Sequence, residues 1–231
     1  GTFGEEVLMM FQEYDYVDGA KIQFTKLNFF ISELALVSAG SDESKTELSE
    51  INNIDLSFDR NNPTDAANGV TLTIKDIPVG NYSGLSVGFG VAADLNRTKP
   101  VDYGAGHPLR SNFWDGWSSY IFSVIEGGFD MNNNGEIVLG GSESEGFTYH
   151  SGTDELYQDG FIAQSIELKA GETARVNLKL DAKELFKNNN PTYDTNGDGY
   201  LDIELFSGTH SDTFLEVARQ IMVNFGNAIS L

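Results

Sequence analysis

Residues 162–180 read IAQSIELKAGETARVNLKL, and this stretch carries the clearest strand pattern of the chain. Apolar residues alternate with polar ones on both sides of Ala170-Gly171-Glu172, which is the periodicity of two half-buried strands joined by a turn. The same alternation marks residues 70–75. Further strands are expected at 6–12, 21–25, 28–38, 84–91, 119–126 and 136–139, separated by turns rich in Gly and Asn.

Two helices interrupt this pattern. Asp181 and Glu184 form a capping box that predicts a short helix at 182–188. A second capping box, Thr213 with Glu216, precedes a helical face near the end of the chain, formed by Phe214, Val217, Ala218, Ile221 and Phe225, and Gly226 suits its stop.

Loops and domain organisation complete the fold prediction. The acidic stretch 41–50 and the segment 59–68 indicate long surface loops, and no internal repeat or linker divides the chain. We therefore expect one all-β domain over residues 1–231. It should be an antiparallel β-sandwich of the immunoglobulin-like, Greek-key type with a short C-terminal helix.

Composition limits the partners. The chain has 231 residues with 14 basic and 35 acidic side chains, a net charge of −21, which disfavours nucleic acid and anionic membrane surfaces. It has no cysteine, which excludes disulfides, thiolate metal sites and thiol catalysis. No apolar run is long enough for a transmembrane segment. The leading Gly1 resembles the remnant of a trimmed chain, so we expect that an export signal or lipid anchor could have preceded it.

The sharpest local motif is DTNGDGYLD at 194–202. It fits the first nine positions of an EF-hand-type loop, whose alternate side chains converge on a hard cation that needs six to eight oxygens. The predicted Ca²⁺ ligands are Asp194, Asn196, Asp198, the Tyr200 carbonyl and Asp202. Position twelve is Leu205 instead of Glu, so the full EF-hand is absent, and a solvated Asp/Asn/Gly turn is the alternative. The segment DMNNNGE at 130–136 matches the same motif only in part, and a plain hairpin turn is the favoured interpretation there.

Catalytic patterns are missing. No Ser–His–Asp order and no Gly-x-Ser-x-Gly elbow occurs, and one carboxylate pair cannot be selected from 35 candidates. The three histidines, His107, His150 and His210, stand in turn-like contexts, where isolated histidines are usually surface or capping residues; they could also converge on copper or zinc. Both tryptophans, Trp114 and Trp117, lie in one aromatic segment, which is read as core packing or as a sugar-stacking platform.

A series of short segments, taken in order, matches the pattern of one family. The segments are KIQFTKLNFFIS (21–32), IPVGNY (77–82), VGFGV (87–91), Asn96, HPL (107–109), the Trp114/Trp117 region, YIF (120–122), EG (126–127), FTYHSG (147–152), His210, Ala218 and Asn224. Together they resemble the MbnP-like proteins, named for a periplasmic copper-binding protein associated with methanobactin. The likeness spans roughly residues 20–231 and is carried by shared order more than by any one motif.

The resemblance implies an exported β-sandwich, often a lipoprotein, in the periplasm or at the outer membrane or cell surface. It implies copper bound through His150 and His210, with His107 as a plausible third ligand. It also implies a tryptophan, Trp114 or Trp117, oxidised to kynurenine by a partner di-haem cytochrome c peroxidase-like protein. The tryptophan spacing and the loop at 194–202 depart from the family pattern.

Two functions follow. The first is an extracytoplasmic metal-binding protein, not an enzyme, with copper near the tryptophans and a separate structural calcium. The second is a calcium-stabilised cell-surface module for carbohydrate or protein that lacks copper. A member of the same fold that has lost its copper site is a third possibility.

Overall fold

The computed structural model describes residues 1–140, 144–209 and 214–231, and antiparallel strands dominate it. The strands are β1 (Thr2–Phe3), β2 (Glu6–Val7), β3 (Glu13–Asp15), β4 (Lys21–Ser38), β5 (Lys45–Asp55), β6 (Gly80–Phe89), β7 (Phe113–Trp114), β8 (Ser119–Phe129), β9 (Gly146–Gly152), β10 (Gln158–Leu168), β11 (Lys179–Leu180), β12 (Gly208–Thr209) and β13 (Ile229–Ser230). The helices are α1 (Pro63–Asn68), α2 (Ala93–Asn96) and α3 (Leu215–Ala228), with 3₁₀ turns η1 (Pro100–Asp102), η2 (Pro108–Arg110), η3 (Asp154–Leu156) and η4 (Glu184–Phe186).

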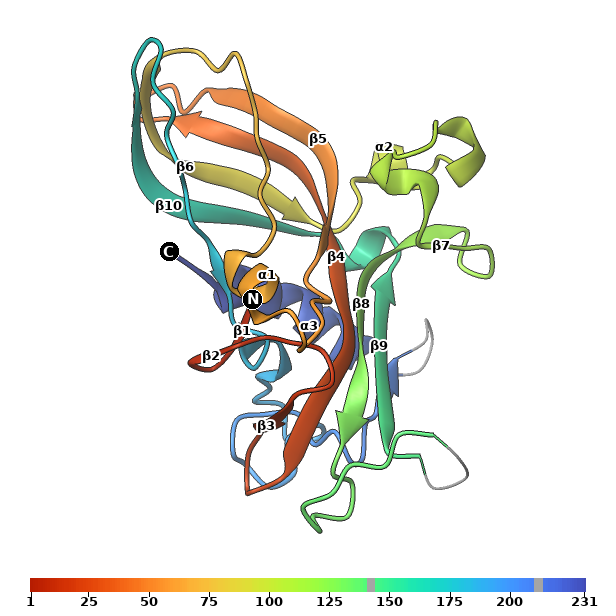
Figure 1. Ribbon diagram of the computed structural model, residues 1–231. Coiled ribbons are helices and arrows are strands. Elements are labelled where there is room, and N and C mark those ends of the chain that lie inside the picture. Colours follow the sequence, from red (N-terminus) through yellow and green to blue (C-terminus); the bar gives the residue numbers. More distant parts are fainter. Residues whose placement is uncertain (141–143, 210–213) are drawn as a thin grey trace.

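Strand β4 is common to both halves of the main sheet (Figure 1). Its first half pairs with β3 on one side and β8 on the other, and its second half pairs with β5 and β6. The path continues outward as β6–β10 in one direction and β8–β9–β12 in the other. Only the β9–β12 pair within this path is parallel. The expected all-β, antiparallel architecture with a short C-terminal helix is confirmed.

The length of β4 corrects the expectation of two strands at 21–25 and 28–38. The chain stays in the sheet through Lys26 and Leu27, and the β4–β8 register shifts between Phe24 and Lys26. Such a bulge breaks the two-residue alternation without ending the strand. A second irregularity lies near Glu33, whose φ is 52°. The register toward β6 shifts between Ser32 and Ala35, and the register toward β5 shifts just after it, between Leu34 and Ala35.

The stretch 162–180 is only partly the predicted hairpin. Its first half belongs to β10, which pairs with β6, and the turn at 169–172 forms around Gly171 with a φ of 77°. Residues 169–178 and 70–75, however, carry no strand assignment. Ile74 and Val176 are partly buried against the core, whereas Val70, Leu72 and Leu178 are exposed. The alternation in these two segments therefore marks neither a hydrogen-bonded strand nor a continuous buried face.

Other boundaries also differ from the expectation. Residues 6–12 contain only the two-residue β2, and no strand forms at 136–139. The helix expected at 182–188 is the single 3₁₀ turn η4. The supposed loops at 41–50 and 59–68 contain the start of β5 and the helix α1. The turn at 130–136 is a plain turn, in which the buried Asp130 carboxylate accepts hydrogen bonds from the N–H groups of Asn134 and Gly135.

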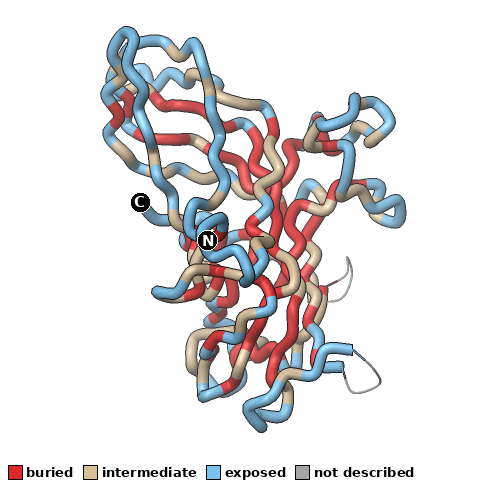
Figure 2. The backbone as a smooth tube through the Cα atoms, viewed as in Figure 1, coloured by how far each residue is buried: buried red, intermediate tan, exposed pale blue. Residues whose placement is uncertain are grey.

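The core is aromatic and lies along the central strands (Figure 2). Helix α3 covers it with Val217, Ala218, Ile221, Met222 and Phe225. The Phe225 ring lies 4.7 Å from the Phe29 ring and 5.9 Å from the Phe89 ring. Since rings at these separations pack favourably, Phe225 anchors α3 to both β4 and β6.

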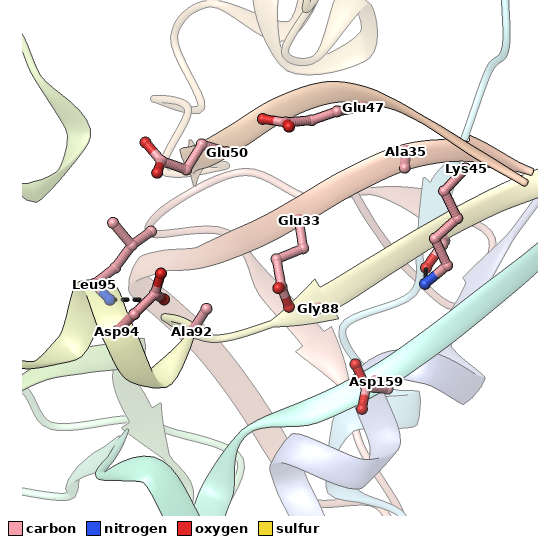
Figure 3. A pocket seen from close by; sticks show the side chains of 11 residues that line it. Glu33, Ala35, Lys45, Glu47, Glu50, Gly88, Ala92, Asp94, Leu95 and Asp159 are labelled. Atoms are coloured by element: carbon pink, nitrogen blue, oxygen red, sulfur yellow. Dashed lines mark hydrogen bonds between the residues drawn. The ribbon is translucent and has the colours of Figure 1, made fainter.

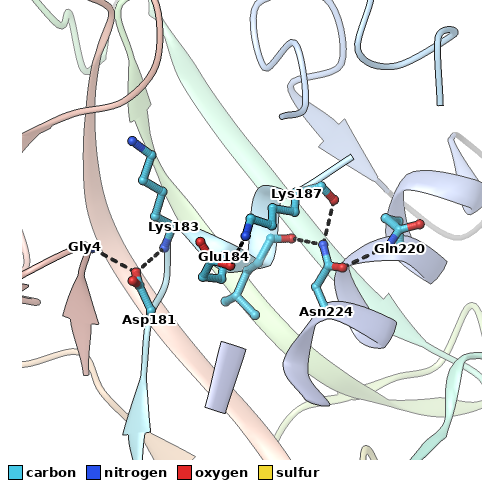
Figure 4. A network of polar contacts seen from close by, with 8 residues as sticks. Gly4, Asp181, Lys183, Glu184, Lys187, Gln220 and Asn224 are labelled. Atoms are coloured by element: carbon cyan, nitrogen blue, oxygen red, sulfur yellow. Dashed lines mark hydrogen bonds and ion pairs between the residues drawn. The ribbon is translucent and has the colours of Figure 1, made fainter. Parts of the chain in front are cut away.

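A polar network fixes the other side of α3 (Figure 4). The buried Asn224 amide donates to the carbonyls of Leu185 and Lys187 at 2.9 and 2.8 Å, and its oxygen accepts from Gln220 at 2.9 Å. One side chain thus satisfies one carbonyl of η4 and the carbonyl of its C-cap residue, which helix packing would otherwise leave unpaired. Among the helices of the described residues, none is long and apolar enough to cross a bilayer.

Candidate metal centre

A small cavity lies where β9, the turn before β8 and helix α3 meet. It is lined by Trp117, His150, Gly152, Thr153, Leu156, Thr209, Leu215 and Ala218. Its volume of about 10 Å³ is close to that of one water molecule. The cavity therefore has room for a single ion or water and not for a sugar.

Trp117 and His150 come together here because of a glycine. His150 and Gly152 are two positions apart on β9, so they face the same side of the sheet. A Cβ at Gly152 would lie 2.9 Å from the Trp117 ring and 2.8 Å from the Tyr120 carbonyl oxygen. Only glycine lets the indole rest directly on the strand backbone beside the imidazole.

A carboxylate orients the imidazole. His150 Nε2 lies 2.8 Å from Glu126 Oε1, and the two side chains are only partly exposed, at 18% and 34%. Val124 stands opposite His150 in the β8–β9 ladder, so Glu126 is the diagonal neighbour on the same face. A carboxylate that accepts from Nε2–H makes Nδ1 the basic nitrogen, as in the carboxylate–histidine pairs that support metal ligands.

Two threonines complete the polar lining. Thr209 Oγ1 donates to the His150 carbonyl at 3.0 Å, which ties β12 to β9 beside the imidazole. Thr153 Oγ1 is buried and has no hydrogen-bond partner among the described residues. A buried hydroxyl without a partner is costly, and a small polar occupant of the cavity would satisfy it. This lining suits an ion or an ion-bound water.

Two of the other predicted copper ligands, His107 and Trp114, do not line this cavity. His107 is the N-cap residue of η2, where its Nδ1 accepts from the Leu109 N–H at 3.2 Å and its ring stacks on Tyr103 at 4.1 Å. Trp114 is half exposed, with its ring 6.4 Å from that of Trp117. His210 lies outside the described residues. The structure therefore joins His150 with Trp117 and gives His107 a capping role.

The acidic side chains of the loop at 194–202 accept hydrogen bonds from the backbone N–H groups of the same loop. Asp194 accepts from the N–H groups of Gly197, Asp198 and Gly199 at 2.8–3.0 Å. Asn196 accepts from the N–H of Asp198, Asp198 from that of Tyr200, and Asp202 from that of Thr195. Across residues 1–140, 144–209 and 214–231, no group of three or more His, Cys, Asp or Glu side chains is placed to hold a metal.

A larger groove lies on the outer face of the β5–β4–β6–β10 half of the sheet (Figure 3). Its volume is about 430 Å³, and it contains none of the residues predicted as ligands. Five carboxylates and one lysine line it together with small residues: Glu33, Glu47, Glu50, Asp94, Asp159, Lys45, Ala35, Ser86, Gly88, Ala92 and Leu95. Figure 3 shows Glu33, Asp94 and Asp159 reaching into the same space from different elements.

Comparison with known proteins identifies the family of the chain. The family model described as MbnP matches residues 1–201, most of the chain. The chain belongs to the MbnP family. Among solved structures, MbnP from Methylosinus trichosporium is similar, with 14% sequence identity, a TM-score of 0.46, and coverage of 80% of this chain and 74% of that one. No curated protein matches the chain.

The sequence does not single out three residues at this site of the MbnP-family chain. Thr153 and Thr209 line the cavity, and Glu126 lies next to it as the partner of His150. Their roles depend on the β8–β9 register across a long connection and on the parallel pairing of β12, which no local pattern specifies. The turn-like context expected for His150 is wrong, because His150 lies inside β9, where its spacing from Gly152 places both residues on one face.

Proposed function

We propose that this MbnP-family chain is an extracytoplasmic copper-binding protein whose site is built on His150 and Trp117. The observation that supports it is the ion-sized cavity that these two side chains line together, beside the buried Thr153 hydroxyl, which has no hydrogen-bond partner within the described part of the chain. Imidazole nitrogen suits copper, and the Glu126 carboxylate favours the His150 tautomer that a ligand needs. The chain would act by binding the metal and not by catalysis.

Trp117 is the tryptophan that we propose for oxidation to kynurenine. It lies in the cavity beside His150, whereas Trp114 does not line the cavity. Kynurenine carries an aromatic amine, so the modified side chain could add a nitrogen ligand. The di-haem peroxidase-like partner and a periplasmic or surface location belong to the same proposal. His210, which lies outside the described residues, remains the predicted second histidine ligand.

An anaerobic Cu(I) titration against a competing chelator tests the site. We expect His150→Ala to lower the affinity by at least about tenfold and Glu126→Gln by about tenfold. His107→Ala is the matched control, because His107 is a histidine outside the cavity, and it should leave the affinity unchanged. An affinity indifferent to His150→Ala would overturn the proposal. The same titration with His210→Ala tests the sequence prediction.

Calcium on the loop at 194–202 is a separate proposal. It is supported by the order of Asp194, Asn196, Asp198 and Asp202 in one tight loop, although their oxygens already accept backbone N–H groups. A calcium titration followed by thermal unfolding tests it: added Ca²⁺ should raise the Tm, and Asp198→Ala should abolish the rise. If Ca²⁺ binds and Cu(I) does not, the calcium-stabilised binding module becomes the better description, with the exposed Trp114 as its stacking surface.

A further inference from the structure

Asn96, the last residue of α2, joins three separate segments of the chain. Its Oδ1 accepts from the Tyr120 N–H at 2.9 Å and from Ser119 Oγ at 3.1 Å, and its Nδ2 donates to Asp154 Oδ1 at 2.7 Å. The residue is 6% exposed. The side-chain oxygen of Asn96 thus accepts two hydrogen bonds from the start of β8, and its NH₂ group donates one to η3.

Ser119 extends this connection to the end of β9. Its Oγ, already bonded to Asn96, accepts from the Thr153 N–H at 3.0 Å. Thr153 has a φ of 74°, so the chain bends sharply immediately after Gly152. Asn96, Ser119, Thr153 and Asp154 form what we term the Asn96 bracket, which fixes the start of β8 against the end of β9.

The Asn96 bracket borders the candidate copper site on two sides. Trp117 lies two residues before Ser119, in a turn closed by hydrogen bonds from Trp117 N to the Trp114 carbonyl and from Ser118 N to the Asp115 carbonyl. Gly152, on which the Trp117 ring rests, immediately precedes Thr153. The Trp117 ring rests on β9 at Gly152 and lines the cavity together with His150. A shift of the turn away from β9 would therefore move the indole away from both residues.

We propose that Asn96 is a positioning residue for the Trp117–His150 site. It is not among the residues that line the cavity, and it acts by holding the turn that carries Trp117 at contact distance from β9. The expected effect of Asn96 on copper affinity rests on the proposed function. The placement of Trp117 can be measured without any metal. A supporting shell of this kind determines whether site residues keep their geometry.

Asn224 offers a matched control. It is 3% exposed and also makes three hydrogen bonds, but it joins α3 to η4 and reaches neither the Trp117 turn nor Ser119. Asn224→Asp therefore removes a comparable buried amide elsewhere. It should lower the stability as Asn96→Asp does, while leaving the Trp117 environment unchanged.

The experiment uses a Trp114→Phe background, in which Trp117 is the single tryptophan. Asn96→Asp keeps both acceptor bonds, loses the donor and sets a second carboxylate against Asp154. We expect red-shifted Trp117 emission, stronger acrylamide quenching and a Cu(I) affinity about tenfold lower. The double substitution Asn96→Asp with Asp154→Asn reverses the donor and acceptor, and should restore both properties. Ser119→Ala, a smaller change, should shift the emission in the same direction.

The readouts separate the two proposals. Unchanged Trp117 emission and quenching in Asn96→Asp, or an equal change in Asn224→Asp, would overturn the positioning role whatever copper does. A failure of the double substitution to restore the emission would also count against it. If the parent protein binds no Cu(I), the proposed function fails, and the fluorescence series alone decides the role of Asn96.

Discussion

Gly152 shows how one residue can determine a site. The absence of a side chain there lets the Trp117 indole lie on β9 beside His150. The sequence predicted no strand at 147–152, so the shared face of His150 and Gly152 emerged only with the β8–β9 pairing. The indole that fills the space could not be predicted either, because it comes from a turn 35 residues earlier whose placement depends on the β8–β9 register.

Gly152→Ala should destabilise the protein by about 1–3 kcal/mol, because the new methyl group meets the Trp117 ring and the Tyr120 carbonyl oxygen. Urea unfolding measures this. Gly146→Ala, on the same strand, is the control: its Cβ would meet nothing closer than 3.6 Å, so the change should stay within about 0.5 kcal/mol. Equal losses for the two variants would show that Trp117 does not pack as described.

At the scale of elements, α3 is the best-predicted part of the described chain. The apolar face inferred from the sequence, including Val217, Ala218, Ile221 and Phe225, is the buried face in the structure. The proposed Thr213 cap lies outside the described residues, and the helix begins after Phe214, whose φ is 56°. Periodicity thus identifies the helix and its face, whereas its contacts with β4 and β6 depend on the fold.

Phe225→Ala should cost about 3–5 kcal/mol, since it removes a fully buried ring that contacts Phe29 and Phe89. Val223→Ala lies on the same helix but at a position that is 40% exposed, and we expect a much smaller loss. Denaturant midpoints of the two variants make the comparison. Similar midpoints would contradict the assigned face of α3.

The extended segment at 169–178 provides another prediction at this scale. It has strand-like alternation and no strand assignment, in contrast to β10 directly before it. Its amides should therefore exchange with solvent deuterium much faster than those of Gln158–Leu168. Exchange followed by mass spectrometry tests this. Equal protection in both segments would mean that the predicted hairpin forms in solution.

For the whole molecule, buried tyrosines link stability to alkaline pH. Burial raises the pKa of Tyr16 and of Tyr149, whose hydroxyls donate to the carbonyls of Leu201 and Phe206. Burial, aided by a hydrogen bond to Glu33, also raises the pKa of Tyr157. Above the unfolded value of about 10, the folded state thus holds more protons than the unfolded state, and the free energy of unfolding must fall as pH rises.

We expect phenolate absorbance at 295 nm to appear in two stages during an alkaline titration, with the buried tyrosines ionising only as the protein unfolds. The same titration in concentrated urea should show one stage. A single ordinary transition for all nine tyrosines in a still-folded protein would contradict their burial.

The all-β class with a C-terminal helix could be predicted from the alternation of apolar residues, the turn residues and one amphipathic segment. The role of β4 could not be predicted, because a strand shared by both halves of a sheet has the same local sequence features as any other buried strand. Its residues are buried almost without interruption, the polar Asn28 and Ser32 included, because both faces are covered, and bulges hide its true length.

The shared strand also has a consequence for the order of folding. β4 occupies residues 21–38, but the β8 partner of its first half spans residues 119–129. Closing that long loop is entropically costly, so the β4–β8 ladder should form late, although β3 and β5 lie close to β4 in the chain and can pair with it early. During synthesis the edge of β4 that pairs with β8 therefore stays open until much of the chain has followed. Unpaired strand edges favour aggregation, so this edge is the part of the nascent sheet that most needs protection.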